Sequence, residues 1–167
     1  MSIYAQELRE RVIKPCLQIF NEDSEVAEIL LLATAARESG LGQHCCCAQT
    51  NGLGLYRITA EKHIELWDKY LIQFPDLASR QRGLASQQQF LKDPHAELVT
   101  NLSYATAMAW MIYRRAAIDT SKPLESTSLA ALWANHFDNG TGSPRNAEDF
   151  MQTYRSLVMD SSKKLVA

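Results

Sequence analysis

Glu38 is the acidic residue of this sequence that is best placed for acid–base chemistry. It lies in the last turn of a helix predicted over residues 24–39, and Ser39 and Gly40 follow it directly. A carboxylate in the last turn of a helix meets the negative end of the helix dipole, which disfavours its charge by about 0.3–1 kcal/mol when exposed. Partial burial acts in the same direction, so both effects predict a raised pKa, as a general acid requires near neutral pH. The alternative is an ordinary solvated glutamate at a helix end.

Four short segments occur in a fixed order around and after this acid. They read Ala-Arg-Glu-Ser-Gly-Leu-Gly at 36–42, Asn-Gly-Leu-Gly-Leu-Tyr-Arg-Ile at 51–58, Asn-Leu-Ser-Tyr-Ala-Thr-Ala at 101–107 and Trp-Ala-Asn-His-Phe-Asp-Asn at 133–139. Together they resemble the motifs of lytic transglycosylases and goose-type lysozymes. With His63 and Trp67, they are similar to small lysozyme-like virion proteins of tailed bacteriophages. The resemblance implies a lysozyme-like helical domain that cleaves peptidoglycan glycan strands, with Glu38 as the catalytic residue.

The resemblance also implies a mechanism that needs a single carboxyl group. Glu38 protonates the glycosidic oxygen between N-acetylmuramic acid and N-acetylglucosamine, then acts as a base while the sugar's own 6-hydroxyl closes an anhydro ring. Hydrolysis by water is the alternative, and its two-carboxylate version needs a second acid. Glu61, Glu65 and Asp68 lie on one predicted helix that also needs a polar outer face, so the sequence offers no convincing partner.

The resemblance implies substrate-binding roles for a further set of residues: Ser39, Tyr56, Arg57, Tyr104, Trp133 and Asn135. Ser39 is expected to orient Glu38 or to bind an N-acetyl group. The two tyrosines are expected to hydrogen-bond the acid or line the sugar subsites, and Trp133 to stack on a sugar face. Core packing is the alternative role, because buried Tyr and Trp rings commonly keep a polar tip satisfied.

Arg57 departs from the family pattern, which has a glutamine at this place. A guanidinium near Glu38 favours the charged carboxylate, against the need of an acid catalyst. If it points away instead, Arg57 is available to a peptide-stem carboxylate or a neighbouring protein. The substitution favours a second hypothesis, in which the chain is a catalytically degenerate, lysozyme-like structural protein of a phage tail or virion.

The cysteines and histidines predict neither a metal site nor a nucleophilic dyad. Three of the four cysteines are adjacent, at residues 45–47, whereas zinc sites separate their cysteines by two to four residues. A reduced loop is therefore the preferred interpretation, even with His44 beside it. No histidine stands at an interpretable spacing from a serine or cysteine, and His63, one helical turn before Trp67, is expected to be an ordered helix residue rather than a base. We expect no metal ion and no cofactor.

Helical periodicity covers most of the sequence, which predicts a mainly α fold. Apolar residues recur at helical spacing over residues 3–19, 24–39, 59–71, 77–91, 95–117 and 126–137. Either Asp23 or Ser24 is expected to cap the second helix and Thr59 the third, and Gly40 is a candidate stop. Pro15 is expected to disturb the first helix.

Two segments are not predicted to be helical throughout. Residues 40–58 are rich in Gly, Cys, Gln and Asn, which indicates a loop with a short β-ribbon at about 42–58. Residues 138–143 predict a turn, after which Ser143 and Pro144 are suited to begin a last helix.

Length and charge limit the remaining classes of function. A chain of 167 residues with 46% apolar content fits one domain over residues 1–167, and its formal net charge of -2 gives no general attraction to nucleic acid. The longest apolar stretch, 29–36, is far shorter than the roughly 20 residues of a membrane helix. The charged, amphipathic N-terminus does not resemble a signal peptide. We therefore expect no nucleic acid partner and no membrane insertion.

These features suit a protein that is made in the host cytoplasm and packaged in a phage virion, beside other virion or tail proteins. An endolysin that a holin releases is a third alternative.

Overall fold

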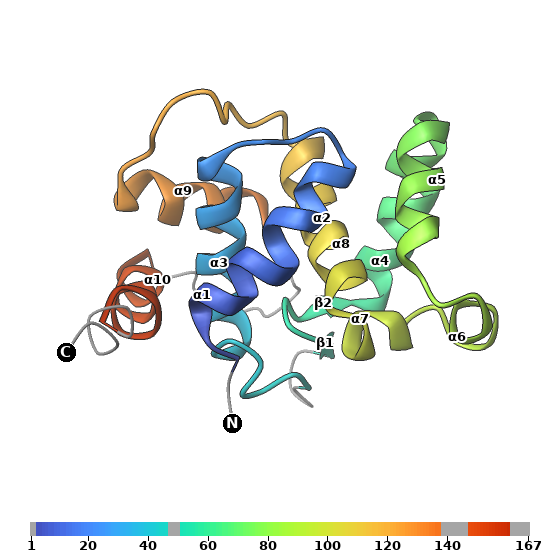
Figure 1. Cartoon of the computed structure of the whole chain (residues 1–167), viewed down its shortest axis with the longest axis horizontal. Coiled ribbons are helices and arrows are strands. Elements are labelled where there is room, and N and C mark those ends of the chain that lie inside the picture. The colour runs from blue at the N-terminus through green and yellow to red at the C-terminus, as the bar shows by residue number, and fades with distance from the viewer. Residues whose placement is uncertain (1–2, 47–50, 138–146, 161–167) are drawn as a thin grey trace.

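The computed structural model describes residues 3–46, 51–137 and 147–160, which are mainly helical with one two-stranded antiparallel sheet (Figure 1). The expected fold class, mainly α with a small β region, is confirmed. The elements are α1 (Ala5–Leu8), the π-helical turn η1 (Arg9–Ile13), α2 (Lys14–Ile19), α3 (Glu25–Ser39), β1 (Gly52–Leu53), β2 (Ile58–Thr59), α4 (Ala60–Glu65), η2 (Leu66–Tyr70), η3 (Leu71–Gln73), α5 (Pro75–Leu84), α6 (Gln87–Lys92), α7 (Ala96–Thr100), α8 (Leu102–Arg115), α9 (Ser126–His136), α10 (Ala147–Tyr154) and η4 (Arg155–Met159). The predicted turn at 138–143, the helix start at Ser143 and Pro144, and Cys47 lie outside the described residues.

The helix α3 lies in the middle of the fold and carries Glu38 at its C-terminal end (Figure 1). The elements η1, α2, α8, α9, α10 and η4 all contact it. Both predicted ends are confirmed: the Ser24 hydroxyl accepts the Ala27 N–H, and Gly40 ends the helix with a left-handed φ of 61°. Because α3 is buried on almost every side, a polar side chain on it needs a partner inside the protein.

The first predicted helix is confirmed as one continuous helical run through α1, η1 and α2. Pro15 is the second residue of α2, and the wider π-helical turn η1 lies directly before α2. A proline has no N–H to donate, and its ring crowds the carbonyl four residues back. The π-helical turn provides that room, so Pro15 widens the helix locally without ending it.

The helix predicted over 77–91 is wrong as a single element, because it is divided into α5 and α6. Ser86 has an extended backbone, and its hydroxyl accepts the N–H of Gln89 at 3.3 Å. A serine that satisfies a free N–H in this way begins a new helix.

The helix predicted over 95–117 is also wrong as a single element, because it is divided at Asn101 into α7 and α8. The Asn101 side-chain oxygen accepts the Tyr104 N–H at 3.0 Å, and its amide donates to the buried Glu97 carboxylate at 2.8 Å. The side chain thus replaces the backbone hydrogen bonds that a continuous helix would have made.

The predicted β-ribbon is confirmed and lies against α7. β1 pairs with β2 through Gly52 opposite Thr59 and Leu53 opposite Ile58. Between the strands, Gly54 has a φ of +73°, and a Cβ atom there would lie 1.6 Å from the carbonyl oxygen of Leu98 in α7. Only glycine permits this approach of two backbones.

The core extends from α1 to η4 and includes few polar groups. One of them is the Tyr113 hydroxyl, which lies 2.7 Å from the Thr34 hydroxyl and so joins α8 to α3. Among the described residues, no helix combines the length and the apolar composition that crossing a bilayer requires.

Candidate active site

The carboxyl group of Glu38 is held at the junction of α3 and α9. Its side chain is buried, with 7% of the residue's surface exposed. The indole Nε1–H of Trp133 donates to its Oε1 at 2.8 Å, across 95 positions of sequence. The two residues belong to the first and the fourth of the sequence segments described above, and the fold brings these segments into contact.

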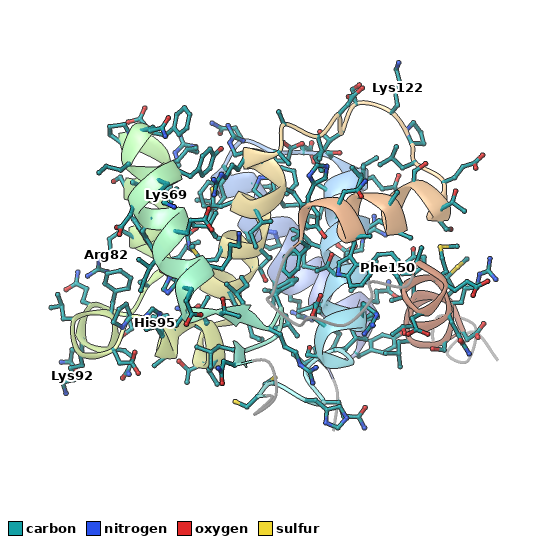
Figure 2. The ribbon with its side chains drawn as sticks, turned by 180° about the vertical axis from the view of Figure 1, so that it is seen from behind. Lys69, Arg82, Lys92, His95, Lys122 and Phe150 are labelled. Carbon is teal, nitrogen blue, oxygen red and sulfur yellow. The ribbon has the colours of Figure 1, made fainter. Side chains whose placement is uncertain are left out.

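Trp133 is itself packed on its ring faces and is only 3% exposed. The Arg37 guanidinium lies over the indole, 5.3 Å from its centroid, and the Phe150 ring stacks on it at 5.3 Å. Phe150 extends from α10 toward the core (Figure 2), and Asp149 of the same helix lies 3.8 Å from Arg37. In this arrangement the ring is covered, so Trp133 contacts the acid and does not present a face for a sugar.

The hydroxyl of Ser39 fastens the end of α3 to the β-ribbon. It is buried, donates to the Leu55 carbonyl at 2.6 Å, and accepts the Gly42 N–H at 2.9 Å. These contacts fix the segment that follows Glu38. The structure therefore gives Ser39 a supporting position beside the acid.

Tyr56 and Tyr104 are both fully buried, so neither lines an open subsite. The Tyr56 hydroxyl lies 3.2 Å from the Thr106 hydroxyl, and burial raises the pKa of Tyr56. Burial likewise raises the pKa of Tyr104. Both phenols are thus neutral hydrogen-bonding groups of the core at any ordinary pH. This is the core-packing role that was the alternative to substrate binding.

The sequence did not predict a polar cluster around His63. The Nε2 atom of His63 lies 2.7 Å from the Tyr104 hydroxyl, its Nδ1 lies 2.9 Å from Nδ1 of His95, and the Trp67 indole donates to the Tyr104 hydroxyl at 3.0 Å. Figure 2 labels His95, which lies at the edge of this cluster near α4 and α7. Burial, and second the neighbouring His95, lower the pKa of His63 to about 4. His63 is therefore a neutral residue of the core.

The directions of these hydrogen bonds follow from the Trp67 indole, which can only donate. The Trp67 N–H is shared between the Tyr104 oxygen at 3.0 Å and Nε2 of His63 at 3.3 Å, so Nε2 is an acceptor and the Tyr104 O–H donates to it. The hydrogen of neutral His63 is then on Nδ1, where it donates to Nδ1 of His95. The sequence contained one signal for this cluster, because His63 and Trp67 stand four residues apart on one helix face.

Arg57 lies beside the cysteine-bearing segment of the ribbon. It has a left-handed φ of 48°, and its Nε donates to the His44 carbonyl at 3.0 Å. Burial and the nearby Cys46 raise the pKa of the Cys45 thiol, and the charge of Arg57 opposes this rise. The guanidinium thus supports the backbone of residues 44–46.

Asn135 is exposed and faces a hollow of about 260 Å³ between α4, α8 and α9. Lys62, Glu65, Arg115 and His136 also line this hollow. Hydrogen bonds from Lys62 and from Arg115 lower the pKa of Glu65 to about 2. Of the residues expected to bind substrate, Asn135 is the one that the structure places on an open surface.

None of the three acids of the helix predicted over 59–71 is buried. Glu61 and Asp68 are exposed, and Glu65 is held in its ion pairs. Within residues 3–46, 51–137 and 147–160, no three His, Cys, Asp or Glu side chains converge as metal ligands would.

No known protein family, no curated protein and no solved structure matches this chain.

Proposed function

We propose that the protein cleaves the glycan strands of peptidoglycan, with Glu38 as the general acid and base. One observation carries the proposal: a carboxyl group is buried at the C-terminal end of the central helix and receives a hydrogen bond from a fixed indole. Burying a carboxyl and placing it at the negative end of a helix both cost stability. A fold that keeps such a group typically does so at a functional site.

The reaction needs one carboxyl group that changes its role. Protonated Glu38 gives its proton to the glycosidic oxygen, the bond from that oxygen to C1 of N-acetylmuramic acid breaks, and the N-acetylglucosamine end leaves as an alcohol. The Glu38 carboxylate then takes the proton of the muramic 6-hydroxyl, and the oxygen of that hydroxyl attacks C1. This step closes a 1,6-anhydro ring and restores the acid. If water attacks instead, the product has a reducing end.

In this proposal the protein acts as a component of a phage virion, on the wall that the particle must pass. The resemblance of the four segments supports this setting, and Asn135 lines an open hollow between α4, α8 and α9. An endolysin would use the same site and chemistry. Mass spectrometry of purified particles distinguishes the two, because only a virion component is present in them.

A specific observation favours a second candidate, a lysozyme-like scaffold without activity. Trp133, Ser39 and both tyrosines have well-packed internal roles, as residues of a purely structural core would have. In that case the Glu38 contact with Trp133 joins α3 to α9 and has no further role.

The test is digestion of purified peptidoglycan by the wild type, by Glu38→Gln and by Glu61→Gln, with the products read by mass spectrometry. Glu61 is an exposed acid of α4 and serves as the matched control. Anhydro-muropeptides from the wild type and from Glu61→Gln, but not from Glu38→Gln, are the expected result. Reducing-end products would move the reaction to hydrolysis. No cleavage by folded wild type would refute the enzyme and favour the scaffold.

A further inference from the structure

We propose that Trp133 is the positioning residue of Glu38, and that its indole N–H holds the carboxyl group in the orientation that proton transfer needs. This inference rests on the proposed function and adds a role that differs from the sugar stacking expected of a tryptophan at this place. It begins from the 2.8 Å hydrogen bond from Nε1 of Trp133 to Oε1 of Glu38.

The chemistry of the indole gives this contact its direction. An indole nitrogen is a donor in every state and never an acceptor. A hydrogen bond from it is strongest to an oxygen that carries no proton, so Oε1 remains the acceptor when Glu38 is protonated. The rotation of the carboxyl group is therefore restricted in both of its protonation states.

The indole can hold the carboxyl in place because its own position is fixed. Arg37 precedes Glu38 on α3 and lies over the ring, while Phe150 of α10 stacks on it at an interplanar angle of 28°. The Arg37 guanidinium in turn lies 3.8 Å from Asp149 of α10. A side chain that is packed in this way loses little further entropy when it holds a catalytic group, which is the basis of preorganisation.

The same packing makes a second role for Trp133 unfavourable. With 3% of its surface exposed, the residue has no ring face to offer a sugar. Loss of the indole should therefore impair the chemical step and leave substrate affinity unchanged. This distinction separates a positioning residue from a sugar platform in kinetic measurements.

The test compares Trp133→Phe with the matched control Trp110→Phe. Trp110 is a buried indole, 2% exposed, whose Nε1 has no hydrogen-bond partner in the described structure. Its replacement removes a similar volume from the core but no hydrogen bond. Replacement of Trp133 by the isosteric benzothienylalanine, which has sulfur in place of N–H, covers the case in which Trp133→Phe does not fold.

The first readout does not depend on activity. The side-chain carboxyl resonance of Glu38, assigned by its absence from Glu38→Gln, is titrated by carbon-13 NMR. Removal of the donor should raise the titration midpoint by about one to two pH units, the shift equivalent to one hydrogen bond to a charged group. The Trp110→Phe variant should leave the midpoint unchanged.

The second readout is peptidoglycan cleavage. In Trp133→Phe, kcat should fall by about 10- to 100-fold, as for other groups that orient a catalytic residue, with KM unchanged. A raised KM with an unchanged midpoint would overturn the proposal and identify a sugar platform. An unchanged midpoint and unchanged kcat would refute the role of Trp133 while the wild type stays active. Inactive wild type would instead refute the proposed function, and with it any catalytic meaning of the contact.

Discussion

Acidification is expected to destabilise this protein through His63. Burial and the neighbouring His95 lower the pKa of His63 to about 4, against 6.5 for the free side chain. The unfolded chain therefore binds a proton between these two values where the folded protein does not, and stability is lost as the pH falls through this range. At about 1.4 kcal/mol for each unit of difference, the free energy of unfolding should fall by about 3 kcal/mol between pH 8 and pH 4.

The hydrogen bonds of the cluster explain this loss in atomic terms. A proton added at Nε2 of His63 would point at the Tyr104 hydroxyl, which already accepts from Trp67 and would have to turn its own hydrogen away. A second positive charge on His95, 2.9 Å away, would add repulsion. Both effects act against the charged form of His63.

The measurement is urea unfolding, followed by circular dichroism at pH 8, 5 and 4, of wild type, His63→Gln and His136→Gln. His136 is exposed and controls for the loss of an ordinary histidine. The free energy of unfolding of His63→Gln should be lower than that of wild type at pH 8. Between pH 8 and pH 4 it should fall by about 3 kcal/mol less than that of wild type. Equal pH dependence in wild type and His63→Gln would refute the reasoning.

Two further predictions concern the β-ribbon beside Glu38. Gly54→Ala should lower the free energy of unfolding by about 3 kcal/mol, because its Cβ would overlap the Leu98 carbonyl, whereas Gly83→Ala, in open space on α5, should stabilise by about 0.5–1 kcal/mol. Thermal unfolding checks both, and equal effects would contradict the close approach. Ser39→Ala should cost about 1–3 kcal/mol, because the Leu55 carbonyl and the Gly42 N–H lose their partner. Hydrogen exchange at Gly42 should accelerate, and unchanged protection there would show that the hydroxyl does not hold this segment.

The sequence predicted those parts of the fold that depend on local signals. Ser24, Thr59 and Gly40 act as the caps and the stop that their residue types indicate. The two divided helices were not predicted, because apolar periodicity continues across Ser86 and Asn101. In both places a short polar side chain satisfies a backbone N–H more favourably than a longer helix would, and periodicity alone does not show this competition.

The burial of Glu38 was predictable from the sequence, but the contacts of its carboxyl group were not. Helix-end position and apolar neighbours indicated that Glu38 is partly buried, and the structure shows it buried. The donor to its carboxyl is far away in sequence, and nothing in a single sequence distinguishes an indole that contacts an acid from one that contacts a sugar. The hydrogen bonds of His63 could not be predicted for the same reason, because His95 is the N-cap residue of α7 and Tyr104 lies on α8. Such pairings depend on tertiary packing, and local pattern does not contain that information.

The placement of Glu38 makes the orientation of its carboxyl group depend on α10. The acid lies on α3, its donor Trp133 on α9, and Phe150, which packs on that donor, on α10. A change in α10 that displaced Phe150 would therefore loosen the indole, and with it the carboxyl group, without touching either residue. The helix that carries Glu38 is capped at each end, so such a change would act on the orientation of the carboxyl group rather than on where α3 begins and ends. The contact between Glu38 and Trp133 therefore depends on three helices, and a substitution in α10 is expected to affect it.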